Sequence, residues 1–275
     1  FVLISNVKKV FLLPKNQLNM EDKTMKRFLT VNLISFIILT VFISSVYPQN
    51  LSAVDILKNV DNVMNSAKDS SVKMKVILID KDKNEKVREM ETIEKDGNKR
   101  LMRFLSPADQ KGISFLSLPD DVQYVYLPAF RKVRRVASNI KNTNFAGTDF
   151  TYEDLSTFEY SKDYDPKLIE TTDTAYVLEL TPKPNVKKEY SMLKMWIRKD
   201  NFYPIKTESY DKKKNLFKIL ERRKIEKIGN YWVAKEMEMK DIKNNHSTKI
   251  IINKVEFDTG LSDDLFTQRN LSHTG

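Results

Sequence analysis

The sequence predicts a mainly β (α+β) fold, with one early helix followed by a long series of antiparallel strands. Over residues 54–64, apolar side chains recur at spacings of three and four, which is typical of one face of a helix. After Ser70 the period changes to two, and this alternation returns repeatedly with short polar turns between the segments. Strands joined by tight turns indicate a single meandering antiparallel sheet.

The early helix starts after Asn50 or Ser52, either of which can cap it. Its predicted apolar face is formed by Val54, Leu57, Val60 and Met64. Strands are expected at 72–78, 86–95, 99–105, 113–118, 122–127, 132–137, 158–163, 174–181, 190–199, 202–210, 215–228, 231–241 and 247–257. The polar segment 138–157 predicts a loop with a short helix over the sheet, and a further helix is expected to start at Ser262.

The composition disfavours most catalytic chemistry. The chain has no cysteine, which removes disulfides, thiolate nucleophiles and cysteine zinc sites. Its two histidines, His246 and His273, are far apart, so a multi-histidine metal centre is not expected. The sequence contains no glycine-rich phosphate loop, no H-E-x-x-H and no G-x-S-x-G. We therefore expect a binding protein rather than an enzyme, with no catalytic residue, no cofactor and no metal.

The first part of the chain predicts export. Residues 1–24 have mixed polarity and are expected to be an upstream extension outside the fold. From Met25, Lys26 and Arg27 precede a short apolar run, which is the layout of a secretory signal peptide over 25–48. The run is shorter than the roughly 20 residues that a spanning helix needs, although an uncleaved anchor is the alternative. Residues 49–275 are expected to form a single domain.

The stretch 103–155 is the most informative part of the chain. An aromatic strand is followed by the basic sequence RKVRR, and acidic and aromatic residues come further along. Their opposite charges predict a latch or a docking surface formed by Arg131, Lys132, Arg134, Arg135, Asp149, Tyr152, Glu153 and Asp154. The alternative is a charged strand edge that discourages pairing. Nucleic acid is not an expected partner, because the aromatic residues alternate with apolar residues rather than with lysines and arginines.

The sequences KGISFL, YVYLPAFRKVRRV and FAGTDFTYEDL resemble the LolA-like outer-membrane lipoprotein-sorting family of exported bacterial proteins. In pattern, the resemblance extends over about residues 51–268. It implies an incomplete antiparallel β-barrel wrapped around a long N-terminal helix, as in LolA and LolB. It also implies a periplasmic carrier or chaperone for an acylated lipoprotein or lipid cargo. An inner-membrane transporter and an outer-membrane acceptor are the partners implied.

A carrier of this kind needs an apolar cavity, because exposing an acyl chain to water costs roughly 0.8 kcal/mol per CH₂. The alternating apolar and aromatic residues expected to line it are Met74, Val76, Phe104, Phe115, Tyr124, Tyr126, Trp196 and Met237. Each could instead belong to a sealed core, since a one-residue slip exchanges the two faces of a strand.

Two other functions stay open at this stage. One is a periplasmic lipid sensor or an accessory subunit of an envelope lipid export system. The other is a hydrolase that uses carboxylates such as Asp149 and Glu153.

Overall fold

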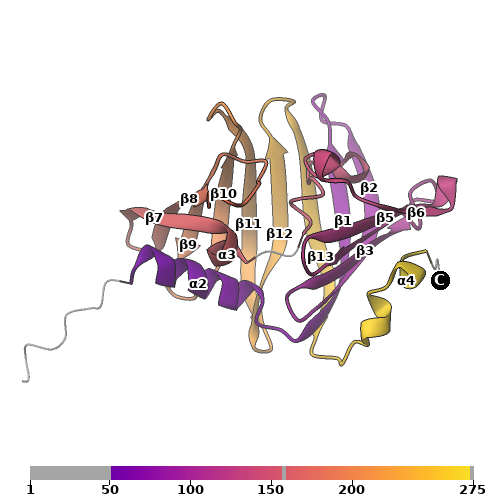
Figure 1. The fold of residues 1–275 in the computed structure, drawn as a ribbon, viewed down its shortest axis with the longest axis horizontal. Helices are drawn as coiled ribbons and strands as arrows, with labels where there is room; N and C mark the ends of the chain where they lie inside the picture. The colour runs from indigo at the N-terminus through magenta and orange to yellow at the C-terminus, as the bar shows by residue number, and fades with distance from the viewer. Residues whose placement is uncertain (1–50, 157–158, 273–275) are drawn as a thin grey trace, which may run out of the picture. The chain divides into compact units, whose positions relative to one another are not determined.

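The structure is a computed structural model that describes residues 51–156 and 159–272. The predicted extension, the signal peptide, Asn50 and His273 lie outside the described residues. In the described part of the chain, thirteen strands form one sheet in the order β6-β5-β4-β3-β2-β1-β13-β12-β11-β10-β9-β8-β7 (Figure 1). The predicted mainly β fold with a large, open, antiparallel sheet is confirmed.

The sheet consists of two meanders that meet at β1 and β13. The first meander contains β1 (Asp69–Ile79), β2 (Glu85–Lys95), β3 (Lys99–Ser106), β4 (Ser114–Leu118), β5 (Val122–Leu127) and β6 (Lys132–Arg135). The second contains β7 (Tyr164–Thr171), β8 (Ala175–Pro182), β9 (Met192–Arg198), β10 (Pro204–Tyr210), β11 (Leu216–Ile228), β12 (Tyr231–Asp241) and β13 (His246–Phe257). Antiparallel pairing from Ser70↔Phe257 to Ile79↔Ser247 joins them.

Helix α2 (Ala53–Met64) lies across one face of the second meander (Figure 1). Ser52 caps it by accepting a hydrogen bond from the Asp55 N–H, as expected. The buried stripe contains Ile56, Leu57 and Val60, which pack with residues of β8 and β9. The predicted face was partly wrong, because Val54 and Met64 at its edges are exposed.

One expected strand, 158–163, was wrong: the structure has the short helix α3 (Tyr160–Asp163) followed by β7. The reason is a contact from α2 that the local pattern does not contain. The buried Asp61 carboxylate accepts hydrogen bonds from the backbone N–H groups of Tyr160 and Ser161, at 2.7 and 2.8 Å. This arrangement satisfies the first donors of a helix, which otherwise have no partner.

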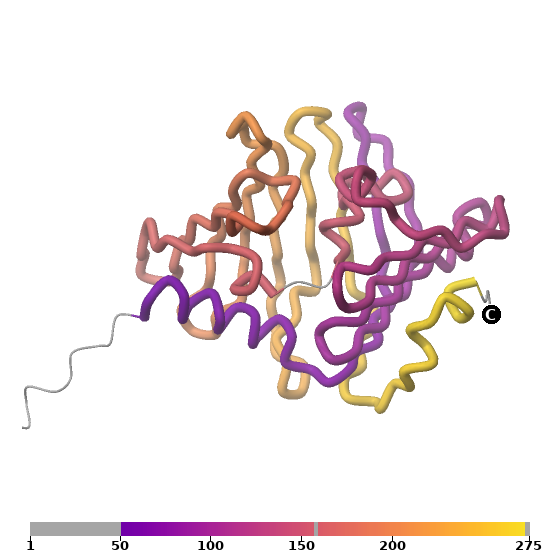
Figure 2. The backbone as a smooth tube through the Cα atoms, in the orientation of Figure 1, coloured from indigo at the N-terminus to yellow at the C-terminus, as the bar shows by residue number. Residues whose placement is uncertain are grey.

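Most of the remaining short helices lie where the sequence predicts them, but the 3₁₀ turn η1 (Pro128–Phe130), between β5 and β6, was not predicted. The loop after β6 contains the 3₁₀ turns η2 (Ser138–Ile140) and η3 (Phe145–Gly147). Ser262 caps η4 (Asp263–Leu265), which is followed by α4 (Gln268–Leu271). This C-terminal segment packs on one face of β3, β4 and β5 through Phe266 and Leu271 (Figure 2). Among the helices of the described residues, none has the length and apolar character to cross a membrane.

Candidate functional site

The inner face of the sheet borders a cavity of about 330 Å³. Its walls come from β1, β2 and β3, from β9 to β13, from the end of α2 and from α3. This volume is within the range of roughly 300–1,000 Å³ that is usual for small-molecule sites. Residues that are far apart in the sequence therefore line a single cavity.

Methionines dominate the apolar wall. Six of the ten methionines in the chain line the cavity: Met64, Met74, Met90, Met102, Met237 and Met239. Leu220, Ile250 and Ile252 complete this side. Because the methionine side chain is unbranched and polarizable, it adapts to ligands of variable shape. The wall is suited to a flexible hydrocarbon chain.

The lining also contains polar residues, several of them tyrosines. Burial raises the pKa of Tyr164 and of Tyr190, so both phenols stay protonated at neutral pH. The Tyr190 hydroxyl donates to the Asp154 carboxylate at 3.0 Å. Tyr203 accepts a hydrogen bond from the Ala234 N–H at 3.2 Å. The lining of the cavity therefore combines hydrocarbon with neutral hydroxyls.

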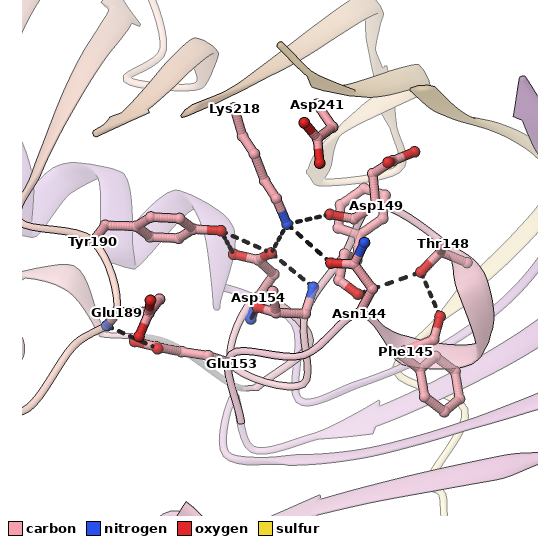
Figure 3. A network of polar contacts seen from close by, with 12 residues as sticks. Asn144, Phe145, Thr148, Asp149, Glu153, Asp154, Glu189, Tyr190, Lys218 and Asp241 are labelled. Carbon is pink, nitrogen blue, oxygen red and sulfur yellow. Dashed lines mark hydrogen bonds and ion pairs between the residues drawn. The ribbon is translucent and has the colours of Figure 1, made fainter. Parts of the chain in front are cut away.

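A loop over residues 144–156 closes part of the cavity, and a buried lysine holds it (Figure 3). Lys218 on β11 is fully buried and donates a 2.6 Å hydrogen bond to the main-chain oxygen of Asp149. The same Nζ lies 3.4 Å from Oδ1 of Asn144 and 3.6 Å from Oδ2 of Asp154. Three acceptors of the loop thus converge on one cation.

The side chain of Asp149 provides a second attachment, to β13. Its carboxylate is 2% exposed and accepts a 2.6 Å hydrogen bond from the Thr248 hydroxyl. Nδ1 of His246 lies 2.8 Å from the same carboxylate oxygen. The loop is consequently fixed to two strands of the sheet, β11 and β13.

The surroundings of Glu153 disfavour the charged form of its carboxyl. Burial raises the pKa of its carboxyl, and the charge of Lys188 and the N–H of Glu189 offset this only in part. The Glu189 N–H donates to Glu153 at 3.1 Å, whereas the Lys188 ammonium is 3.8 Å away. Both Glu153 and Asp154 line the cavity.

The residues predicted to line a cavity fall into three places. Met74 and Met237 lie on the cavity wall. Val76, Phe104 and Phe115 lie in the adjoining core, where both phenylalanine rings are 5.8 Å from the ring of Phe145. Tyr124 and Tyr126 pack with the C-terminal segment, and the Trp196 ring lies between Lys194 and Lys206.

The predicted latch residues are also separated. Lys132, Arg134 and Arg135 are exposed on β6, an edge strand of the sheet, and Arg131 directly precedes it. The Arg134 guanidinium lies 5.3 Å from the centre of the Phe130 ring, which is 59% exposed. Within the described residues, the partners of the three loop acids are instead His246, Lys188 and Lys218. Tyr152 packs its ring against Phe115 and Phe145.

Sequence reasoning missed Lys218 and Arg222, the two buried residues of β11. The available signal was their spacing, since Lys218, Leu220 and Arg222 alternate on one face of the strand. Because lysine and arginine are ordinarily exposed, the pattern predicts that this face of β11 is on the solvent side, whereas it is the buried face.

Comparison with known proteins agrees with this geometry. A family model described as "-like: Uncharacterized protein" matches residues 96–273. A DUF1329 family protein from Desulfovibrio piger is 30% identical; the match covers 80% of this chain and 97% of that one, with a TM-score of 0.74. No curated protein matches the chain.

Two further solved structures have the same fold. A domain provisionally described as an outer membrane lipoprotein-sorting protein, from Vibrio parahaemolyticus, is 29% identical, with 79% and 98% of the two chains covered and a TM-score of 0.69. A LolA superfamily protein from Nitrosomonas europaea is 20% identical, with 80% and 99% covered and a TM-score of 0.67. The open antiparallel sheet thus defines a LolA-like protein. The chain belongs to the DUF1329 family, and its solved neighbours confirm the resemblance to LolA-like proteins.

Proposed function

We propose that the protein is a periplasmic carrier that binds the acyl chains of lipoproteins or other lipids for sorting to the outer membrane. The observation that carries this proposal is the methionine-lined cavity on the inner face of the sheet. An acyl chain placed there would leave water without any chemical step, at a gain of roughly 0.8 kcal/mol per CH₂. The Vibrio parahaemolyticus relative is described as a lipoprotein-sorting domain, which supports the same class of cargo.

The proposal also covers the architecture of the protein, its export and its exchange of cargo with partner proteins. The sheet would act as an incomplete barrel around the N-terminal helix, and the loop 144–156 would serve as a lid over the acyl chain. Export would use the signal peptide predicted over 25–48, followed by exchange with an inner-membrane transporter and an outer-membrane acceptor. The exposed basic residues of β6 would form the docking surface for one of these partners.

A fluorescent fatty acid tests the proposal directly. The wild-type protein is expected to bind it, and Met237→Trp is expected to weaken binding about tenfold or more, because the indole fills part of the cavity. Lys240→Trp is the matched control, since this side chain lies on the other face of β12 and is 37% exposed. Equal binding by all three proteins, or no binding by the wild type, would contradict a carrier that uses this cavity.

A further inference from the structure

Arg222 is a buried cation on the cavity wall. Its side chain is 9% exposed and lies opposite Met237 in the pairing of β11 with β12. Arginine is rarely buried unless it is paired, because a charge loses much of its solvation when it leaves water. The position therefore requires a compensating group.

The carboxylates that border the cavity have partners other than Arg222, and for Asp69 these are the backbone N–H groups of Thr259, Gly260 and Leu261. Glu94 pairs with Arg100 at 2.8 Å, and Asp154 lies 3.6 Å from Lys218. Among the ion pairs formed within residues 51–156 and 159–272, none includes Arg222. Its electrostatic partners are instead the phenols of Tyr160 and Tyr203. Burial raises the pKa of both phenols, and the nearby Arg222 guanidinium offsets only part of this rise. Protonated phenols do not neutralise the arginine.

Several buried polar atoms of the cavity lining have no hydrogen-bond partner among the described residues. Nη1 of Arg222 is buried and has no hydrogen-bond partner among the described residues. The buried hydroxyls of Thr92 and Thr207 are likewise without a partner there, and both residues line the same cavity. Buried polar atoms are nearly always satisfied, so three such atoms around one cavity indicate a missing ligand with acceptor oxygens.

We infer that Arg222 is the binding site for the anionic head group of an amphipathic ligand whose hydrocarbon chain lies along the methionine wall. The inference rests on the proposed function and names its ligand class: a single-chain lipid that ends in a carboxylate or a phosphate. A guanidinium suits both groups, because its planar N–H fork matches two oxygens at once. The partnerless hydroxyls of Thr92 and Thr207 would supply further donors in the same cavity.

The experiment compares two ligands with hydrocarbon chains of the same length, one with an anionic head group and one with a neutral head group. Hexadecanoic acid and 1-hexadecanol are titrated against the wild-type protein at pH 8, each below its aggregation concentration, by displacement of a neutral fluorescent lipid. The wild type is expected to bind the acid at least tenfold more tightly than the alcohol. Arg222→Met is expected to abolish this preference, so that the acid and the alcohol bind the variant with affinities within about twofold of each other.

Arg223→Met is the matched control, because this neighbouring arginine has a side chain that is 45% exposed on the other face of β11. It is expected to retain the full preference for the acid. Replacing the acid with hexadecyl phosphate distinguishes a phosphate site from a carboxylate site, since the tighter of the two anions identifies the head group.

The outcomes separate the two proposals. If the wild type binds the acid and the alcohol equally, the apolar container stands and the anion site is overturned. A preference for the anion that persists in Arg222→Met also overturns the site. If the wild type binds none of the ligands, the proposed function itself fails. The wild-type comparison needs no variant, so the test holds even if Arg222→Met does not fold.

Discussion

Nζ of Lys218 donates a 2.6 Å hydrogen bond to the main-chain oxygen of Asp149, a residue 69 positions earlier in the chain. The contact links β11, near its first residues, to the loop that borders the cavity (Figure 3). A fully buried ammonium is favourable only when its donors are satisfied, and here the loop supplies all of the acceptors. The position of the loop and the burial of the lysine therefore depend on each other.

Lys218→Met is expected to release the loop. The substitution keeps the length of the side chain but leaves the acceptors of the loop, including the Asp154 carboxylate, without their cation. We expect a loss of roughly 3 kcal/mol in the free energy of unfolding. Hydrogen exchange should increase most in residues 144–156.

Lys224→Met is the control for this prediction, because Lys224 lies on the same strand with a side chain that is 68% exposed. Its effect on the free energy of unfolding should be within about 0.5 kcal/mol. Unchanged exchange in the loop of Lys218→Met would contradict the proposed attachment.

Glu153→Gln should alter the dependence of stability on pH. Burial raises the pKa of Glu153 in the folded protein above its usual 4.5, so folding favours the protonated form. Its contribution to stability is then present below about pH 4.5 and is lost as the pH rises through the raised pKa. The variant should gain stability relative to the wild type between pH 4.5 and pH 8 in urea unfolding. A difference between Glu153→Gln and the wild type that does not change with pH would refute the prediction.

Asp69→Asn should have the opposite dependence on pH. Burial alone would raise the pKa of Asp69, but hydrogen bonds from Thr259, Gly260 and Leu261 outweigh it and lower the pKa. The stabilisation by this carboxylate is therefore present above its usual pKa of 3.8 and is lost as the pH falls below that value. At pH 7 the variant should lose about 2 kcal/mol in the free energy of unfolding. The difference from the wild type should shrink at pH 3; a constant difference would contradict this account.

Arg134→Glu combined with Arg135→Glu tests the docking surface on β6. Both side chains are exposed on an edge strand, so reversing their charge should change the free energy of unfolding by less than about 1 kcal/mol. Transfer of cargo from donor to acceptor membranes should nevertheless fall. If transfer is normal while stability drops, these arginines are structural and the docking proposal is wrong.

Most of the strands could be predicted because alternation is a local property of the sequence. The predicted bounds 122–127 and 231–241 agree with β5 and β12. The pairing of β1 with β13 could not be predicted, because it joins the first and last strands and leaves no local pattern. The helix α3 was missed for a related reason, since its cap, Asp61, lies on a different helix.

The cavity was harder to predict than the fold. Alternation places Met74 and Met237 on one face of their strands, but it does not say which face is inside. Tyr124 and Tyr126 resembled cavity residues in sequence, yet the C-terminal segment covers their side of the sheet. Lys218 and Arg222 were missed because their burial depends on the loop and on the cavity, which only the assembled sheet creates.

The most direct test of the central claim is native mass spectrometry of the protein purified from a bacterial periplasm after expression from Met25, followed by organic extraction. The account predicts a species heavier than the polypeptide alone, with a co-purified lipid or an acylated protein in the extract. A polypeptide without any bound mass, combined with no uptake of a fluorescent fatty acid, would contradict the carrier function.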